Sequence, residues 1–287
     1  MLGRTISFNS TSIEWDQEWY LRRYPDVAAA FRDGTVSDPL FHFLQVGLRE
    51  GRYPSAAAET QGWPSGASEN THLGLCVSLG DFSISLNWPV HGEVGKTFAL
   101  KLTNGFFRRF LSGPVILDIG FRGSATDAVP IVPHAIGIDL DYPGYDGIFL
   151  PFTEGSVDTV FASHVLEHVS DAQIAILDWF RVLKVGGYLI CIVPHQYLYE
   201  RKEAPPSRWS GEHLRFYTPG SLMKQFESTL TPNTYRLRHL MDNDLGYDYS
   251  VDLDRHPYGC YEIELVIEKI MPPVWGLSAT TSYTKTR

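Results

Sequence analysis

Residues 115–123 read VILDIGFRG, a short apolar run that ends in glycines. Such a run is typical of a buried strand that enters a tight turn. Strand, turn and helix patterns then alternate along the chain, and this order predicts a parallel sheet with right-handed crossovers. The expected strands are 115–118, 135–139, 157–162 and 187–193. We therefore expect a domain of the α/β class.

Two helices and a strand pair are expected around this sheet. Asp171 is a good N-cap for a helix over 171–183, whose apolar residues form one broad face. Thr218 and the proline that follows it are typical of the start of a second helix. Stretches 235–240 and 261–269 are interpreted as a final antiparallel pair.

Five motifs follow one another in this part of the chain. They are VILDIGFRG at 115–123, GID at 137–139, LPF at 150–152, VDTVFASHVLEH at 157–168 and RVLKVGGY at 181–188. In this order they resemble the small, "type 11" class I S-adenosylmethionine-dependent methyltransferases, a group that includes many sugar, quinone and natural-product methylases. The resemblance covers about 115–269 and implies a Rossmann-like sheet with S-adenosylmethionine as cofactor. Because 139–150 is too short for the usual helix and third strand, the sheet is expected to lack that strand.

Composition and charge argue against several classes of function. The 287 residues carry a formal net charge of -9, which disfavours binding to nucleic-acid phosphates or to anionic lipid. No apolar run is long enough to span a bilayer, and the N-terminus lacks an apolar signal core. Cys76, Cys191 and Cys260 are too widely spaced for a disulfide framework and indicate a reducing compartment. The expected location is the cytoplasm, with no nucleic-acid partner and no membrane span.

Residues 1–54 are expected to form an N-terminal helical module, because apolar and aromatic residues recur there at helical spacing, interrupted by Pro25. This module resembles one in bacterial glycosyltransferases and other polysaccharide-related proteins. It is either a recognition module or a packing appendage. In the second case, Trp15, Trp19 and Tyr20 anchor it to the body of the protein. The N-terminal helices are also the expected surface for a protein partner or for self-association.

The other boundaries follow from composition and pattern. Residues 55–72 lack a periodic apolar pattern and are typical of a linker. Residues 73–112 alternate in part and then become apolar at helical spacing, which predicts a hairpin and a lead-in helix. The methyltransferase-like domain is expected at 113–270, followed by a C-terminal tail at 271–287.

Polar side chains fall where the expected parallel strands end, at the edge where doubly wound sheets bind ligands. Asp118 lies at the end of the first strand, Asp139 at the end of the second, and Ser163 and His164 follow the third. Asp118 is placed to accept a hydrogen bond from the cofactor's amino group. Asp139, 21 residues further on, is placed to accept both ribose hydroxyls. Each carboxylate alone is equally well explained as a cap or turn former, so the prediction rests on the set.

The glycine turn departs from the family pattern. Glycines let the backbone approach a cofactor closely, which makes Gly120 and Gly123 candidate cofactor-binding residues. The family has three alternating glycines, whereas Arg122 stands between the two glycines here. Arg122 either replaces a lost backbone contact or blocks the site. The resemblance also implies that Asp146 receives the adenine amino group.

Methyl transfer to a hydroxyl needs an aligned acceptor and a group that removes its proton. His195, just after an expected strand, and His213, in the stretch HLRFYTP, are the candidate catalytic bases. The loop after His195, residues 196–217, is interpreted as a lid or, equally well, as a solvated loop. Its candidate substrate-binding residues are Tyr197, Arg201, Arg208, Trp209 and Arg215. No metal site is expected, because the acids between residues 242 and 254 do not fit a calcium loop.

These observations favour S-adenosylmethionine-dependent methylation of a hydroxyl on a glycan or another small polar acceptor, in bacterial polysaccharide biosynthesis. The main alternative is a catalytically inactive methyltransferase-like scaffold beside glycan-assembly enzymes, which the departure at Arg122 suggests. A carbohydrate-associated binding protein is the third interpretation. Cofactor affinity and turnover distinguish the three.

Overall fold

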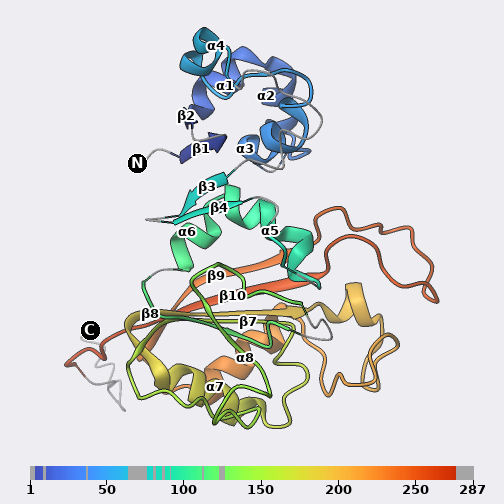
Figure 1. Ribbon diagram of the computed structural model, residues 1–287. Helices are drawn as coiled ribbons and strands as arrows, with labels where there is room; N and C mark the ends of the chain where they lie inside the picture. Colours follow the sequence, from blue (N-terminus) through green and yellow to red (C-terminus); the bar gives the residue numbers. More distant parts are fainter. Residues whose placement is uncertain are drawn as a thin grey trace, which may run out of the picture.

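The computed structural model describes residues 4–8, 11–36, 38–63, 76–79, 82–85, 88–90, 92–111, 113–122 and 127–275. Its central element is a six-stranded sheet with the strand order β6-β5-β7-β8-β10-β9 (Figure 1). The strands are β5 (Ile116–Ile119), β6 (Ile136–Ile138), β7 (Val157–Ser163), β8 (Leu183–Pro194), β9 (Tyr235–Asn243) and β10 (Glu262–Lys269).

The sheet is mostly parallel, as the sequence predicts. β5 pairs in parallel with β6 and β7, and β7 with β8, whereas β10 is antiparallel to both β8 and β9. The α/β class and the C-terminal antiparallel pair are therefore confirmed. β6 forms one edge, and no described residue forms a strand beyond it. This agrees with the short connection at 139–150.

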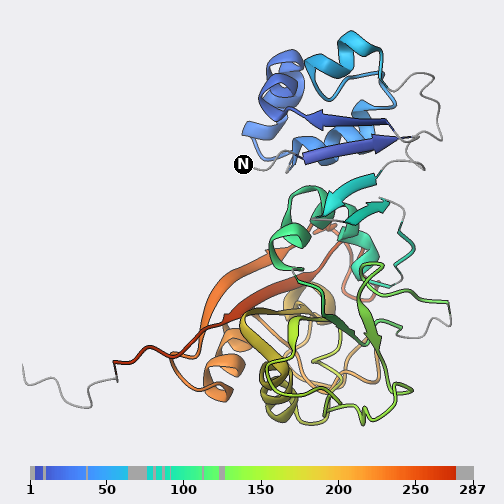
Figure 2. The same ribbon diagram turned by 60° about the vertical axis from the view of Figure 1, so that its left-hand side comes forward.

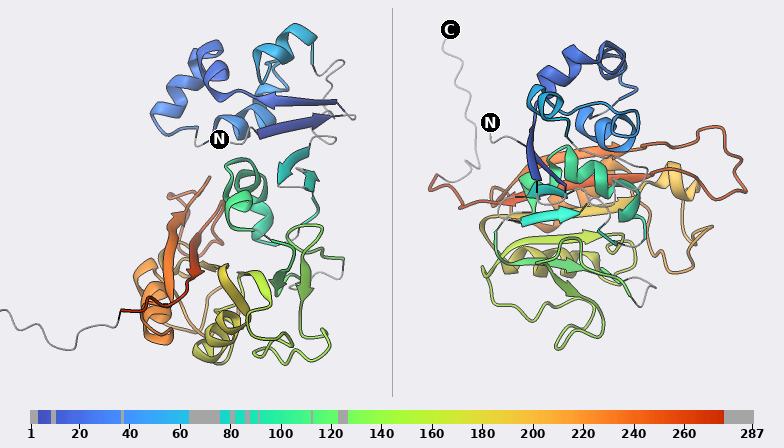
Figure 3. Two further views of the ribbon diagram at one scale, coloured as in Figure 1. Left: turned by 90° about the vertical axis from the view of Figure 1, so that its left-hand side faces the viewer. Right: turned by 45° about the horizontal axis from the view of Figure 1, so that its top comes forward.

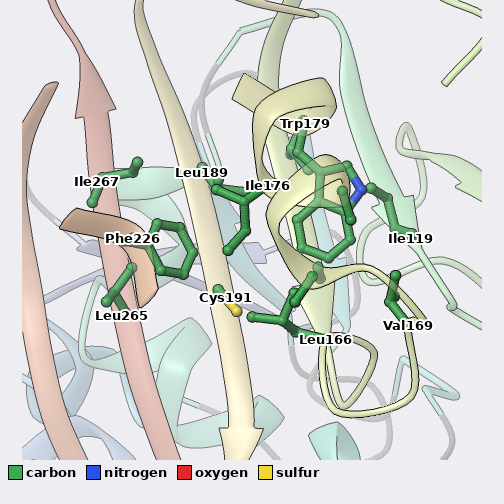
Figure 4. Close-up of a cluster of buried hydrophobic side chains, with 14 of the residues drawn as sticks. Ile119, Leu166, Val169, Ile176, Trp179, Leu189, Cys191, Phe226, Leu265 and Ile267 are labelled. Carbon is green, nitrogen blue, oxygen red and sulfur yellow. The ribbon is translucent and has the colours of Figure 1, made fainter. Parts of the chain in front are cut away.

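One face of the sheet is covered by two helices (Figure 1). Trp179 and Phe226 from these helices are completely buried against Cys191 of β8 (Figure 4). Asp171 caps the first helix, where its carboxylate accepts two backbone N–H groups. Thr218 opens the second helix through a capping box. The helices are α7 (Ala172–Val182) and α8 (Pro219–Thr229).

The opposite face carries α5 (Val94–Thr103) and α6 (Phe106–Phe110), which lie between the sheet and the N-terminal module (Figures 2 and 3). The Phe107 ring packs 6.4 Å from the Phe161 ring of β7, measured between centroids. Gly105 separates the two helices with a φ of 87°, a left-handed conformation that favours glycine. The expected lead-in helix is therefore present as two pieces.

A buried charge network ties α5 to the C-terminal strands. Lys101 Nζ lies 2.9 Å from Glu262 Oε2 and 2.9 Å from Glu264 Oε1. All three side chains are at most 2% exposed. Burial works against ionisation of Glu262, but the Lys101 ammonium and the His164 ring hold the pKa of that carboxyl at about 2. Because buried charges are costly unless paired, this network fixes Glu262 in place at the edge of the site.

The N-terminal residues form strands as well as helices. β1 pairs with β2 and β3, and β3 with β4, in an antiparallel sheet of order β2-β1-β3-β4. The sequence pattern indicates only helices before residue 54, because β1 is completed by a distant strand, with Ile6 opposite Val77. The elements are β1 (Arg4–Phe8), β2 (Thr11–Trp15), α1 (Gln17–Arg23), α2 (Pro25–Arg32), α3 (Pro39–His42), the π-helical turn η1 (Phe43–Gly47), α4 (Ala56–Gln61), β3 (Cys76–Leu79) and β4 (Phe82–Ser85). α4 lies within the segment interpreted as a linker, and 64–75 lie outside the described residues.

Aromatic side chains form the core of the N-terminal module. The Tyr20 ring lies 4.8 Å from Trp15 and 5.7 Å from Phe43, between centroids, and Trp19 packs at the margin of the same cluster. Gly47 is required here, because a Cβ would overlap the Tyr20 hydroxyl. The cluster continues through α5 and α6 to the sheet. Trp15 and Tyr20 are therefore core residues. None of the described helices is long and apolar enough to cross a membrane.

Candidate functional site

Two adjoining pockets lie where β5, β6 and β7 end, and Gly120 and His164 border both. The first, the β5 pocket, is lined also by Val90, Glu93, Asp118, Phe121, Arg122 and Ser163. The second, the β6 pocket, is lined also by Asp139, Tyr145, Asp146, Ile148, His168 and Glu212. This is the edge of an α/β sheet at which ligands bind. The structure thus brings the predicted cofactor residues Asp118, Gly120, Asp139, Asp146, Ser163 and His164 into one groove.

Asp118 forms a buried wall of the β5 pocket and is 5% exposed. Its Oδ2 accepts the backbone N–H of Ile131 at 2.5 Å. Burial raises the pKa of Asp118 to about 7, the negative charge of Asp139 adds to the rise, and the Ile131 N–H opposes it. A carboxyl group with a raised pKa at a pocket wall is typical of a binding site. The cationic amino group of the cofactor would favour the ionised form of Asp118, which is the form that accepts the predicted hydrogen bond.

Asp139 follows β6 and is partly buried. Its Oδ1 accepts the N–H of Leu140 at 2.8 Å, and its Oδ2 accepts the N–H of Arg122 at 3.3 Å. Each carboxylate oxygen keeps a second lone pair for a ribose hydroxyl. The Arg122 guanidinium bonds Asp141 Oδ2 at 2.7 Å, and both side chains are exposed. The backbone of Arg122, not its guanidinium, therefore meets the predicted ribose carboxylate.

The turn between β5 and β6 approaches its neighbours closely. Gly120 has a φ of 70°, and a Cβ there would overlap the Val165 side chain. Glycine is thus required by packing alone. Gly123 lies outside the described residues. Ser163 Oγ, on the wall of the β5 pocket, is buried and has no hydrogen-bond partner among the residues that the structure describes. An unused buried hydroxyl of this kind fits a polar ligand in the groove.

Asp146 stands at the far side of the β6 pocket. Its Oδ1 accepts the backbone N–H groups of Ile148 at 3.0 Å and Phe149 at 2.7 Å. These bonds, with the Phe149 N–H first, hold the pKa of Asp146 below its usual value. The carboxylate shapes the turn that borders the pocket, and its role toward adenine stays a prediction.

His164 borders both pockets and adopts a left-handed backbone with a φ of 56°. Its Nε2 lies 3.4 Å from Glu262 Oε1, and its Nδ1 lies 3.6 Å from Glu167 Oε1. Burial by itself lowers the pKa of His164, but the Glu262 and Glu167 carboxylates outweigh it and the pKa is raised. A non-glycine residue held in this conformation is characteristic of functional sites.

His195 lies at the end of β8 and borders neither pocket. Its Nδ1 accepts the N–H of Tyr197 at 3.0 Å, so the proton of the neutral ring sits on Nε2. That atom lies 3.7 Å from Asp242 Oδ1. Burial lowers the pKa of His195, and the Asp242 carboxylate opposes the change. In this orientation the ring donates from Nε2.

His213 is buried and joined to an equally buried carboxylate. Its Nδ1 lies 2.5 Å from Glu200 Oε1, and Glu200 is 1% exposed. The His213 ring packs edge-on against His168 with 4.7 Å between centroids, and His168 borders the β6 pocket. His213 thus reaches the groove only through His168.

The five predicted substrate-binding residues divide into two sets. Arg201 and Arg215 each donate to three backbone carbonyls of other loops. Trp209 Nε1 donates to another carbonyl at 2.9 Å. Tyr197, at 63% exposure, and Arg208 are exposed. The first set holds the loops together, whereas Tyr197 and Arg208 lie at the surface, with the Arg208 guanidinium over the Trp209 ring.

Four glutamates near the groove, of which Glu167, Glu200 and Glu262 are buried, escaped prediction from the sequence. Glu93 borders the β5 pocket, and Glu262 and Glu167 flank His164. Glu200 orients His213. The only signal was an acid among apolar residues, as in β10, where every residue from Glu262 to Ile267 is buried. A buried acid of this kind points to a partner but does not name it.

A mostly parallel sheet with carboxylates at its first two strand ends defines a Rossmann-like, nucleotide-cofactor class of protein. Residues 131–191 match a family model described as a methyltransferase domain. The chain is similar to a SAM-dependent methyltransferase from Aquifex aeolicus, with 14% identity, 64% of this chain and 97% of that chain covered, and a TM-score of 0.39. It is also similar to a SAM-dependent methyltransferase from Methanosarcina mazei, with 16% identity, 58% and 97% covered, and a TM-score of 0.40. No curated protein matches the sequence significantly.

The chain therefore carries a methyltransferase domain, and S-adenosylmethionine is the cofactor of that domain. The match includes β6 and β7 and most of β8, the strands that carry Asp139 and Ser163 at their ends. The unpartnered Ser163 hydroxyl and the buried Asp118 carboxyl are the features of this groove that fit the cofactor's polar end.

Proposed function

We propose that this chain transfers the methyl group of S-adenosylmethionine to a hydroxyl of a glycan or another small polar acceptor, in polysaccharide biosynthesis. The observation that carries the proposal is the groove made by the β5 pocket and the β6 pocket, which join at Gly120 and His164. The cofactor supplies an electrophilic methyl group on a sulfonium sulfur. In this proposal Asp139 holds the ribose and Asp118 holds the amino group.

The different surroundings of the two predicted bases support different roles for them. His195 stays neutral at physiological pH because burial lowers its pKa, and neutrality is the state that a general base requires. Its Nδ1 lone pair accepts the Tyr197 N–H, so the ring can remove the acceptor's proton only after it releases that N–H. His213 is held by Glu200 away from the solvent. We therefore assign His195 the role of the base that acts on the acceptor hydroxyl, and His213 a positioning role.

The acceptor class is supported by the chain's own residues. The N-terminal module resembles one from glycosyltransferases, which favours a glycan and its biosynthesis. Tyr197 and Arg208 are exposed on the loop after β8. An aromatic ring and a guanidinium are suitable for a sugar face and for a phosphate or carboxylate, respectively. The proposed acceptor therefore carries both a sugar ring and a negative charge.

Transfer of a radiolabelled methyl group tests this proposal. We expect label from methyl-labelled S-adenosylmethionine in the glycan fraction of a cell extract, as a methyl ether that resists mild base. Asp139→Ala should lose the transfer, whereas Asp141→Ala, two residues further along and exposed, should keep it. Label in protein, or no label with any fraction, would contradict the proposal. The second result would favour the inactive scaffold.

A further inference from the structure

Glu167 has a completely buried carboxyl group whose oxygens make no hydrogen bond within the described residues. An ionised carboxylate in such a place is strongly disfavoured unless a cation or several donors compensate it. The rings of His164 and His168 approach to 3.6 and 3.8 Å, beyond hydrogen-bonding distance. The carboxylate therefore fits a cation that lies between these groups.

Two histidines converge on this carboxylate. Glu167, His168 and His213 each offer one ligand atom, and these atoms all lie within 4.8 Å of one another. The Nδ1 atoms have other partners: His213 Nδ1 meets Glu200 Oε1 at 2.5 Å, and His168 Nδ1 meets the Glu212 carbonyl at 3.3 Å. An acceptor at Nδ1 keeps the proton there and leaves the Nε2 lone pair for a metal ion.

The two segments that carry these ligands are bound to each other. Arg215 donates to three backbone carbonyls within 166–170. Leu166 and Val169, on either side of Glu167 and His168, insert their side chains into the core (Figure 4). Glu167 and His168 are thus fixed between two anchored residues. A site that is held in this way needs little rearrangement when an ion binds.

We propose that Glu167, His168 and His213 bind a divalent first-row transition-metal ion, with Zn²⁺ as the best fit, at the margin of the β6 pocket. Bonds from zinc to nitrogen or oxygen are about 2.0–2.2 Å, so ligand atoms around a tetrahedral ion lie about 3.4 Å apart. The three candidate ligand atoms, all within 4.8 Å of one another, are close to this spacing. Two imidazoles and one carboxylate suit zinc, whereas Mg²⁺ and Ca²⁺ take oxygen ligands.

The local charges balance a dication. Glu167 and Glu200 together supply two negative charges, and Glu200 also accepts the Ser207 hydroxyl at 2.5 Å. A carboxylate behind a ligand histidine orients the ring and raises its basicity. The ion joins His213 to the loop with His168 and so fixes one wall of the β6 pocket. Its binding does not depend on which acceptor is methylated.

Metal binding is measured on tag-free, full-length protein after dialysis against a chelator. We expect one Zn²⁺ per chain by elemental mass spectrometry after reloading. Co²⁺ in place of Zn²⁺ should give the intense visible absorption of a four- or five-coordinate ion. A Co²⁺ spectrum identical to that of the hydrated ion would overturn the proposal. This readout needs no variant and no enzymatic activity, so its failure is distinct from failure of methyl transfer.

A pair of histidine variants locates the ion. His213→Gln removes a ligand. His256→Gln removes a histidine outside the proposed site that also packs against Tyr199, whose ring centroid lies 5.5 Å from that of each histidine. We expect the Co²⁺ absorption to disappear in the first variant and to persist in the second. Equal spectra from both variants would place the ion elsewhere and refute the assignment.

Glu200→Gln tests the orienting role of the second carboxylate. The variant keeps all three ligands and the side-chain shape but weakens the acceptor at His213 Nδ1. We expect the Kd for Zn²⁺ to rise about 10–100-fold, with one ion still bound per chain. An unchanged Kd would show that Glu200 does not orient a metal ligand.

Discussion

Replacing Asp118 by asparagine tests the electrostatics of the groove. The two side chains have nearly the same shape, and the amide oxygen can still accept the Ile131 N–H that Asp118 accepts at 2.5 Å. The change therefore removes a buried charge and little else. Burial, with a smaller contribution from Asp139, raises the pKa of Asp118 from 3.8 to about 7. At about 1.4 kcal/mol per pH unit, the rise disfavours the ionised form in the folded chain by about 4 kcal/mol.

The pH dependence follows from linkage. Because the pKa of Asp118 in the folded chain lies above its value in the unfolded chain, its contribution to stability is fully present below about pH 4 and is lost as the pH rises through about 7. The wild type should therefore lose stability relative to the Asp118→Asn variant by up to about 1.4 kcal/mol per pH unit in that window. An unpaired amide group costs the variant about 1–3 kcal/mol. The net gain at about pH 8 is then roughly 1–3 kcal/mol.

Urea unfolding followed by tryptophan fluorescence measures this difference. We expect the free energy of unfolding to favour Asp118→Asn at about pH 8, and the gap to fall by about 2–3 kcal/mol at about pH 5. A gap of the same size at both pH values would refute the buried, titrating carboxylate. The same variant should bind S-adenosylhomocysteine about 10–100-fold more weakly, since a charge-assisted hydrogen bond contributes about 1.5–3 kcal/mol. Stability and cofactor affinity should thus change in opposite directions.

Two further substitutions test the packing around the groove. Gly120→Ala should lower the free energy of unfolding by about 1–3 kcal/mol more than Gly155→Ala does. Both glycines have a positive φ, but only at Gly120 would the added Cβ meet the Val165 side chain. Equal losses from the two variants would contradict this packing. Lys101→Met leaves Glu262 buried without its cation and should cost about 3–5 kcal/mol of stability, measured by the same unfolding assay. A loss under about 1 kcal/mol would show that the buried network does not stabilise the fold.

The rule that α/β sheets bind ligands at the carboxyl ends of their strands explains how the sequence could place the candidate cofactor residues at one edge. Asp118 and Asp139 belong to adjacent parallel strands, so their shared edge follows from the strand pattern alone. Ser163 and His164 join them because β7 pairs with β5 on its other side. The expected lack of a third strand followed from the short connection after Asp139. These features depend on short-range pattern and on general rules of topology.

The features that the sequence did not predict depend on contacts between residues that are far apart in the chain. Arg201 and Arg215 are suitable for an anionic ligand by residue type, but the structure uses them to hold backbone carbonyls elsewhere in the chain. No local pattern indicates such partners. The meeting of Glu167 with His213 has the same origin, because it requires two loops to fold against each other. The pairing of β1 with β3 is a third case.

Titration calorimetry with S-adenosylhomocysteine tests the central claim most directly. The intact protein should bind with micromolar affinity. Asp139→Ala should lose the binding because it removes the acceptor for both ribose hydroxyls, whereas Asp141→Ala should keep it. Absence of binding by the intact protein, or equal binding by both variants, would contradict the assignment of this groove to the cofactor.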